Sequence, residues 1–450
     1  MRHAELVREL EFALAGLPVF DVHTHLVGGR LGARGLHDVL LYHMVVSDLY
    51  SAGCPDGARL SQFPAWPDAK EAAGRVERAL PILPHIRNTS SWWAVRLILR
   101  DLYGWEEPIT RSNWRRLDGL IRERADDRGW HHSILERLNI QRTGTEIARR
   151  GRGQDDDRLQ YALEWGFFTR CQWGEHDTAL YELERCWGRN PGSPSPIGAG
   201  GRPEPARRIQ SLEDVHGAVE HYVRAIPYEQ VLATATHIST DLDLRLVGEG
   251  EMCRALARRG QAGPAERDVY ASYVNELFLT RLENEARRRG HPVVFQFSFG
   301  AEPLPFETGS RLGQRTIAQV AEMMARHPGL QFQCFLASRH ANQSLCTLAR
   351  ELPNFSLAGY WWHNFFPDVI RQVMAERLDM VPVNKQVGFF SDAYCVEWTY
   401  AKAVLVRLQL ARVLAERVEQ GQYSVPEAVS VARAVLFETP RTLLRMKPRV

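Results

Sequence analysis

The stretch Pro18-Val19-Phe20-Asp21-Val22-His23-Thr24-His25-Leu26 decides the fold prediction. Its apolar and β-branched residues, bounded by Pro18 and the following Gly28-Gly29 turn, predict a short buried strand. Side chains two residues apart on a strand point to the same face, so His23 and His25 should project together from its carboxyl end. Two imidazoles placed in this way can chelate one metal ion. The alternative is a pair of polar histidines satisfied by hydrogen bonds at a strand end.

Seven further strands are predicted along the chain, over residues 138–146, 158–168, 231–237, 292–298, 330–336, 355–361 and 386–390. Helical patterns alternate with them, over residues 3–16, 36–50, 211–225, 266–289, 314–326, 396–420 and 425–446. Eight strands alternating with helices favour right-handed βαβ units and an α/β fold of the (β/α)8 TIM-like barrel type. An open doubly wound sheet is the alternative, but no glycine fingerprint for a dinucleotide or a phosphate follows any strand.

One connection is too long for a simple barrel. Residues 71–138 are helical in pattern, which predicts a helical insertion after strand 1. We therefore expect a barrel start with the metal-binding strand over 1–53, an inserted helical layer over 54–137, and the remaining barrel with C-terminal helices over 138–450. The Pro- and Gly-rich residues 189–206 predict a flexible loop.

Composition limits the class of protein. The 450 residues are 44% hydrophobic and 24% charged, as expected for a globular chain with a large core. The net charge of +2 gives no reason to expect a nucleic-acid partner. No run of 18 apolar residues occurs, so no membrane span is expected. The seven cysteines are widely spaced without a C-x-x-C pair, and no signal peptide is evident, which favours reduced thiols in the cytoplasm.

In a barrel, the carboxyl ends of the strands meet at one mouth, where the chemistry is expected. Asp392 follows an apolar strand and would face the histidine pair there, as a third metal ligand or as a base. The alternative for Asp392 is a helix N-cap. His237 ends another strand and would be a ligand, a substrate hydrogen-bond donor or a satisfied core histidine. Trp361-Trp362-His363-Asn364 would form either a sugar-stacking wall or ordinary packing.

The order of these landmarks resembles the uronate isomerases (the glucuronate isomerase family) of the amidohydrolase superfamily, as a divergent member. The likeness spans residues 15–446 and is carried by segments 20–26, 138–146, 296–301, 358–364 and 387–392. It implies an aldose–ketose isomerase acting on a hexuronate of the glucuronate or fructuronate type, with a proton moved between C2 and C1. A divalent metal, usually zinc, would orient the carbonyl and hydroxyl groups of this small sugar acid, and a homo-oligomer is possible.

The resemblance also implies residue roles. His23, His25 and Asp392 would hold the metal. Catalysis would involve Asp392, Tyr42 and His237, and substrate binding would involve Trp362, His363, Asn364 and Arg339. Binuclear members of the superfamily use a carboxylated lysine at the end of a middle strand, where this chain has none of its four lysines, so one metal ion is expected.

Several positions depart from the family pattern. The family has a histidine where this chain has Ser298, and its Asp-x-Arg at the last strand is Asp392-Ala393-Tyr394 here. The arginine suited to a uronate carboxylate is therefore missing. Two other functions follow as alternatives: a divergent metal-dependent hydrolase or lyase acting on a small carbohydrate or lactone, and a non-catalytic binding protein with a degraded site.

Overall fold

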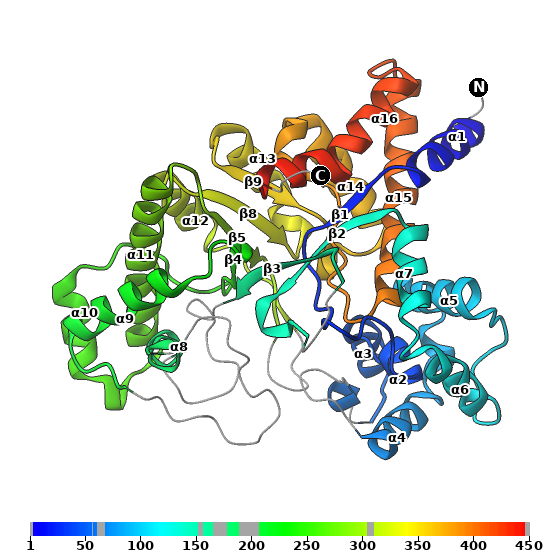
Figure 1. Ribbon diagram of the computed structural model, residues 1–450, viewed down its shortest axis with the longest axis horizontal. Coiled ribbons are helices and arrows are strands. Elements are labelled where there is room, and N and C mark those ends of the chain that lie inside the picture. Colours follow the sequence, from blue (N-terminus) through cyan, green and yellow to red (C-terminus); the bar gives the residue numbers. More distant parts are fainter. Residues whose placement is uncertain are drawn as a thin grey trace.

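The computed structural model describes residues 3–55, 57–60, 68–151, 156–164, 178–188, 207–303 and 310–445. Within these ranges, eight parallel strands form one sheet in the order β1-β2-β3-β4-β5-β8-β9-β10. The strands are β1 (Val19–Asp21), β2 (Ile140–Glu146), β3 (Leu159–Glu164), β4 (Val231–His237), β5 (Val294–Phe299), β8 (Gln331–Leu336), β9 (Phe355–Ala358) and β10 (Gln386–Val387). A separate antiparallel pair consists of β6 (Glu302–Pro303) and β7 (Ser310–Arg311). The sheet curls with helices around it, as expected for a TIM-like α/β fold (Figure 1).

Helices fill the connections between the strands. Those before β3 are α1 (His3–Ala15), α2 (Leu36–Leu40), α3 (His43–Ser51), α4 (Ala69–Ala79), α5 (Ser90–Tyr103), α6 (Trp114–Arg124) and α7 (Arg128–Arg137). Those between β3 and β9 are α8 (Thr178–Cys186), α9 (Leu212–Ala225), α10 (Glu249–Ala257), α11 (Pro264–Arg289), α12 (Ile317–Arg326) and α13 (Asn342–Glu351). The last are α14 (Pro367–Met380), α15 (Val396–Glu419), α16 (Val425–Arg433) and α17 (Thr439–Leu443).

The helices α2–α7 lie between β1 and β2 in chain order and form the blue-to-cyan group in Figure 1, opposite the green helices α8–α11. Helices α5 and α7 both pack against α15, so this group contacts the C-terminal part of the chain. The boundaries at 53/54 and 137/138 stay a prediction. None of the described helices is long and apolar enough to cross a membrane.

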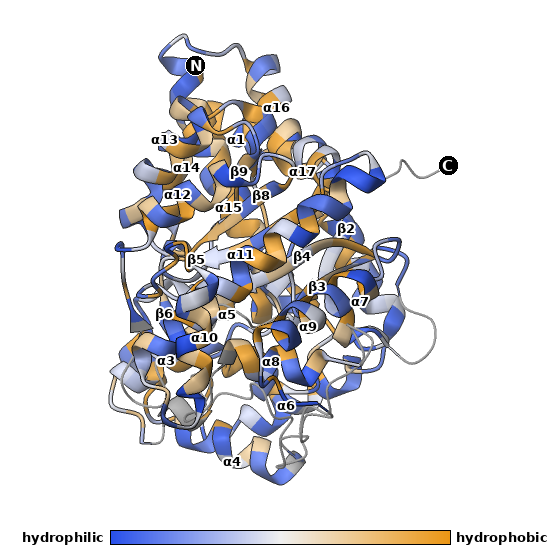
Figure 2. Ribbon diagram, turned by 90° about the vertical axis from the view of Figure 1, so that its left-hand side faces the viewer, coloured by the Kyte–Doolittle hydropathy of each residue, from blue (hydrophilic) through white to orange (hydrophobic). Residues whose placement is uncertain are grey.

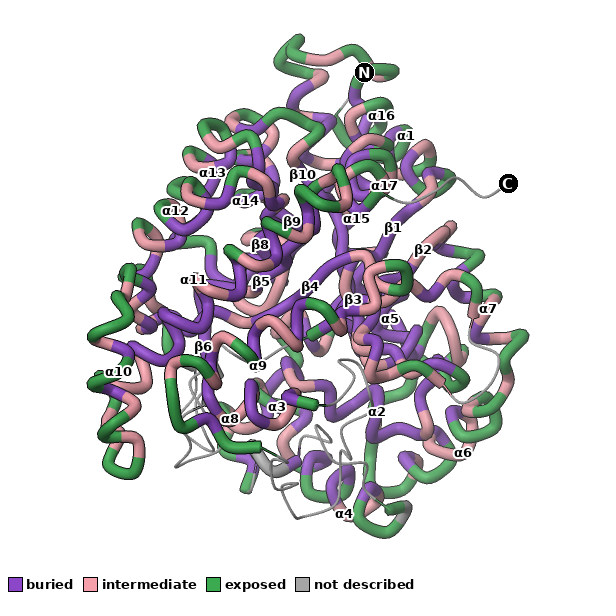
Figure 3. Tube along the Cα trace, turned by 60° about the vertical axis from the view of Figure 1, so that its left-hand side comes forward, coloured by how far each residue is buried: buried purple, intermediate pink, exposed green. Residues whose placement is uncertain are grey.

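Successive side chains on each strand point alternately into the barrel and toward the surrounding helices. On β5, Phe295, Phe297 and Phe299 pack outward in the cluster that includes the helices α9, α11 and α12. The alternate residue Val294 packs inward with Phe20 of β1, Ala233 of β4 and the C-terminal Leu444. Because side chains alternate in direction, Ser298 and His237 share the inner face with these residues and lie at the carboxyl ends of their strands. Figures 2 and 3 show that the central strands are largely apolar and buried, and that helix faces turned outward are hydrophilic and exposed.

The two edges of the sheet meet through backbone hydrogen bonds beyond the ends of β1 and β10. The Asp392 N–H donates to the His23 carbonyl at 3.0 Å, and the His25 N–H donates to the Ala393 carbonyl at 2.8 Å. On the other side, the Thr24 N–H donates to the Gly144 carbonyl of β2 at 2.7 Å. The segment that carries the histidine pair is therefore held between β2 and the chain that follows β10.

Four sequence expectations about local structure were too simple. The strand expected over 18–26 ends at Asp21, and those over 355–361 and 386–390 end at Ala358 and Val387. The helix expected over 36–50 is broken, because Tyr42 has an extended backbone (φ −61°, ψ 142°) between α2 and α3. In each case the departure lies at the site end of an element, where contacts across the mouth override local propensity. The flexible loop predicted over 189–206 lies outside the described residues.

A glycine in β2 lets the histidine segment approach closely. A Cβ atom at Gly144 would lie 2.4 Å from the Val22 carbonyl oxygen and 2.8 Å from its carbon. The Gly144→Ala substitution must therefore push two backbones apart, and we expect it to lower the free energy of unfolding by about 1–3 kcal/mol. Urea unfolding followed by circular dichroism measures this loss.

The matched control is Gly119→Ala in α6, where the new methyl group meets no atom within 4 Å. That change should raise the free energy of unfolding by roughly 0.5–1 kcal/mol, because alanine favours a helix interior. Equal stability of the Gly144 variant and the unaltered protein would contradict the close approach of β1 and β2.

Candidate metal centre

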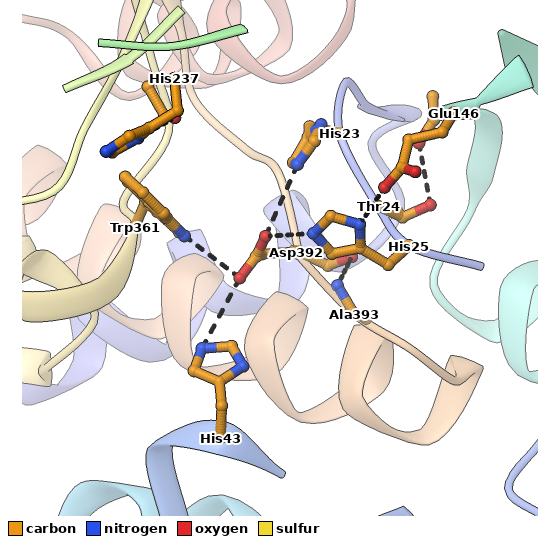
Figure 4. A network of polar contacts seen from close by, with 12 residues as sticks. His23, Thr24, His25, His43, Glu146, His237, Trp361, Asp392 and Ala393 are labelled. Carbon is orange, nitrogen blue, oxygen red and sulfur yellow. Dashed lines mark hydrogen bonds and ion pairs between the residues drawn. The ribbon is translucent and has the colours of Figure 1, made fainter. Parts of the chain in front are cut away.

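Asp392 lies at the centre of a cluster of polar side chains at the carboxyl ends of the strands (Figure 4). Its Oδ1 is 3.2 Å from Nε2 of His25 and 3.6 Å from Nε2 of His23. The three side chains are at most 15% exposed. Residues nearly four hundred positions apart thus bring two imidazole nitrogens and one carboxylate oxygen to one point.

The outer nitrogen of His25 is held by a carboxylate. Nδ1 of His25 lies 2.6 Å from Oε1 of Glu146, at the end of β2, and Nε of Arg149 lies 3.0 Å from the same oxygen. The ring of Tyr394 stacks on His25 with 4.7 Å between the ring centroids. The hydrogen bond at Nδ1 and the stacked ring set the orientation of the imidazole and leave Nε2 directed at Asp392.

The second oxygen of Asp392 is surrounded by donors. Nε1 of Trp361 donates to Oδ2 at 3.2 Å, and the Tyr42 hydroxyl lies 3.4 Å from it. Nε2 of His43 lies 3.7 Å from the same atom. The two oxygens are therefore distinct, since Oδ1 faces the histidine pair and Oδ2 faces Trp361, Tyr42 and His43.

Burial and charge determine the protonation of this cluster. Burial alone would raise the pKa of Asp392, but hydrogen bonds from His23 and His25 hold it well below its usual range. Burial opposes protonation of His25, yet Asp392 and Glu146 together raise its pKa to about 9. Burial lowers the pKa of His23, and it lowers that of His43 to about 3. The two carboxylates thus keep a proton on His25 in the metal-free protein, and an ion bound at Nε2 would replace that proton.

The donor set fits a divalent metal ion. Zinc commonly binds imidazole nitrogens and carboxylate oxygens. A histidine that binds zinc usually donates its other ring N–H to a carboxylate, as Nδ1 of His25 does to Glu146. A further carboxylate is near, because Glu164 at the end of β3 has an oxygen within 4.8 Å of a ring nitrogen of each histidine. Desolvation of the Glu164 carboxyl group at the strand ends, together with the nearby Glu146 carboxylate, raises its pKa to about 8.

Comparison with solved structures identifies the architecture. Glucuronate isomerase from Caulobacter crescentus aligns with a TM-score of 0.77 and 15% identity, covering 100% of this chain and 95% of that one. Uronate isomerase from Thermotoga maritima aligns with a TM-score of 0.73 and 12% identity, covering 98% and 97%. The fold is that of the uronate isomerases.

Another solved structure also aligns. A proposed metal-dependent hydrolase from Lactobacillus casei gives a TM-score of 0.59 and 13% identity, covering 98% of this chain and 99% of that one. No protein-family model and no curated protein sequence matches the chain. At 12–15% identity, the uronate isomerase likeness establishes the architecture of the chain and not its reaction.

The fifth strand of the sheet carries Ser298, the residue that the sequence resemblance matches with a histidine. Its Oγ lies 2.8 Å from Nδ1 of His237 on the neighbouring strand β4. The other ring nitrogen of His237 is buried without a hydrogen-bond partner among the described residues, and burial lowers the His237 pKa to about 4. The His237 ring packs edge-on against Trp361, with 6.1 Å between centroids, which places His237 beside the Asp392 cluster (Figure 4).

The residues predicted to bind substrate separate into two groups. Trp362 and His363 stack on each other, with 5.7 Å between ring centroids, and Trp362 lies 6.2 Å from the His43 ring. Asn364 is fully buried, and its amide donates to the Leu336 carbonyl at 3.0 Å, which holds β8 in place. Arg339 is exposed and donates to Gln372 of α14 at 2.6 Å. Trp362 and His363 therefore lie beside the cluster, whereas Asn364 and Arg339 bond to other parts of the fold.

Among the contributors to the cluster that were not recognised from sequence are His43, the indole N–H of Trp361, and Lys402 of α15. Nζ of Lys402 donates to the Tyr42 hydroxyl at 2.8 Å. His43 directly follows Tyr42, and Trp361 directly precedes Trp362. Their position next to these predicted site residues was the signal that could have identified them. Lys402 gave none, because it lies in the middle of a long helix and only the packing of α15 brings it to Tyr42.

Proposed function

We propose that this protein is a metal-dependent aldose–ketose isomerase acting on a hexuronate or a related sugar acid. The observation that carries the proposal is that Nε2 of His23 and Nε2 of His25 both lie within 3.6 Å of Oδ1 of Asp392, in a fold shared with uronate isomerases. The parallel-strand architecture supports it, because active sites of such folds lie at the carboxyl ends of the strands.

His23, His25 and Asp392 would hold one divalent ion, with zinc favoured by the nitrogen and oxygen donors. When bound, such an ion supplies Lewis-acid polarisation of the substrate carbonyl and hydroxyl oxygens. Glu146 would orient the His25 ring through the hydrogen bond at Nδ1, opposite the metal-binding Nε2. None of the four lysines of the sequence ends a predicted middle strand, where a carboxylated lysine would bridge two metal ions, so this proposal has a single ion.

The protein groups would carry the proton. In this proposal, Oδ2 of Asp392 accepts a proton from C2 of the open-chain sugar and returns it at C1. Nε2 of the neutral His43 lies 3.7 Å from that oxygen and would receive or return a substrate hydroxyl proton. Trp362 and His363 would form one wall for the sugar. Nε2 of His237, which has no partner among the described residues, would hydrogen-bond a substrate oxygen.

A direct assay tests the proposal. Purified protein is analysed for bound metal and is then incubated with glucuronate and with galacturonate in the presence of zinc or manganese. We expect about one equivalent of metal per chain and formation of the corresponding ketohexuronate. Absence of a ketose product from every hexuronate tried would reject the isomerase.

A hydrolase is the second candidate, favoured by Tyr394 at the position of the family arginine and by the likeness to the Lactobacillus casei structure. The ring of Tyr394 stacks on His25 and cannot bind a carboxylate through two parallel hydrogen bonds as an arginine does. Turnover of a neutral lactone or ester, with none of a hexuronate, would select this function. Protein that contains no metal and binds none would instead support a non-catalytic binding role.

A further inference from the structure

Lys402 is a buried lysine beside the candidate metal centre that none of the proposed steps uses. Its side chain is 1% exposed, and Nζ donates to the Tyr42 hydroxyl oxygen at 2.8 Å. The ammonium also lies over the rings of Tyr42 and Phe365, at 4.9 and 4.7 Å from their centroids. Among the described residues, Tyr42 is its hydrogen-bond acceptor.

This contact determines the direction of the Tyr42 hydroxyl. An ammonium group has three donors and no acceptor, so the tyrosine oxygen must accept from Lys402. The hydroxyl proton must then point elsewhere, and the acceptors within reach are both on Asp392: the main-chain carbonyl at 2.8 Å and Oδ2 at 3.4 Å. Lys402 thus makes Tyr42 a donor to Asp392.

Asp392 needs such a support, because its backbone is strained. Its φ of +52° lies in the left-handed region, which residues other than glycine adopt infrequently and aspartate more readily than most, so contacts that hold this conformation matter. The N–H is held by the His23 carbonyl at 3.0 Å, and the carbonyl is held by the Tyr42 hydroxyl. This backbone conformation presents Oδ1 to His23 and His25.

We propose that Lys402 is a positioning residue for the metal centre: through the Tyr42 hydroxyl, it holds Asp392 in the conformation that directs Oδ1 to the histidine pair. The inference rests on the proposed function in one respect, since it requires that the centre binds a metal ion. The proposal adds a residue of α15 to those that shape the metal centre.

The sign of the effect separates this role from simple electrostatics. Removal of a nearby positive charge should by itself strengthen the binding of a cation. Loss of the support for Asp392 should weaken it instead, by roughly 10–100-fold, as when other outer partners of metal ligands are removed. Lys402→Met keeps the length of the side chain and removes its charge and donors.

The experiment measures the zinc dissociation constant by competition with a chromophoric chelator, and the visible spectrum of the cobalt(II) form. We expect weaker zinc binding and an altered cobalt spectrum for K402M and for Y42F. The double variant should bind no more weakly than the weaker single variant, because both changes act on the same hydroxyl group. If K402M does not fold, K402Q replaces it, with weaker zinc binding again expected.

Lys385→Met is the matched control. Nζ of Lys385 also donates to backbone oxygens of a packed region, those of Ala349 and Leu352, but it contacts no residue of the metal centre. Its loss should lower thermal stability and leave zinc affinity unchanged.

Unchanged or tighter zinc binding by the Lys402 variant, or additive losses in the double variant, would overturn the inference while leaving the proposed function intact. An unaltered protein that binds no metal would overturn both.

Discussion

Replacement of His25 by alanine is expected to lower zinc affinity by more than about 100-fold and to reduce turnover by roughly 10²–10⁴-fold. Nε2 of His25 lies closer to Oδ1 of Asp392 than any other ring nitrogen of the pair, at 3.2 Å. The substitution removes this donor and leaves the carboxylates of Asp392 and Glu146 next to each other without the cation between them. Elemental analysis of the purified variant and chelator competition measure the loss of metal, and ketose formation measures the loss of activity.

His216→Ala is the control for a lost imidazole. Nε2 of His216 lies 2.8 Å from the Tyr273 hydroxyl, between helices α9 and α11, and neither residue contacts the centre. Metal content and turnover should remain those of the unaltered protein. Full metal occupancy in the His25 variant would show that the histidine pair is a structural feature of the strand end and not a ligand pair.

Asp392→Asn is expected to reduce kcat by about 10²–10⁴-fold, which is the range typical of a lost general acid–base group. Asparagine has the shape of aspartate and tolerates a left-handed backbone, so the φ of +52° can persist. The amide retains one acceptor oxygen but cannot take a proton as the carboxylate does. The variant therefore tests the charge and basicity of Asp392 separately from its position.

The measurement is steady-state kinetics with the hexuronate that the unaltered protein converts, at saturating metal. Asp379→Asn, which removes a carboxylate paired with Arg417 away from the centre, should leave kcat unchanged. A kcat of the Asp392 variant within tenfold of the unaltered value would contradict a catalytic role for this carboxylate.

Where a feature depended on side-chain periodicity, the amino-acid sequence was enough. The strand predicted over 231–237 is β4 with the same limits, and the helix predicted over 211–225 is α9, whose N-cap Ser211 forms a capping box with Asp214. Local alternation and capping determine such elements because their backbone hydrogen bonds and buried faces lie within a few residues. The same reasoning placed His23, His25 and Asp392 at strand ends, and the parallel sheet then brought them together.

Tertiary structure alone decided how these groups are arranged. The break between α2 and α3 at Tyr42, the left-handed backbone of Asp392 and the approach of Lys402 have no local signature. Each depends on contacts between residues about 350 positions apart, made only when the edges of the sheet meet. Sequence patterns therefore determined which side chains reach the mouth, because periodicity is local, while closure of the sheet determined which oxygen of Asp392 faces which partner.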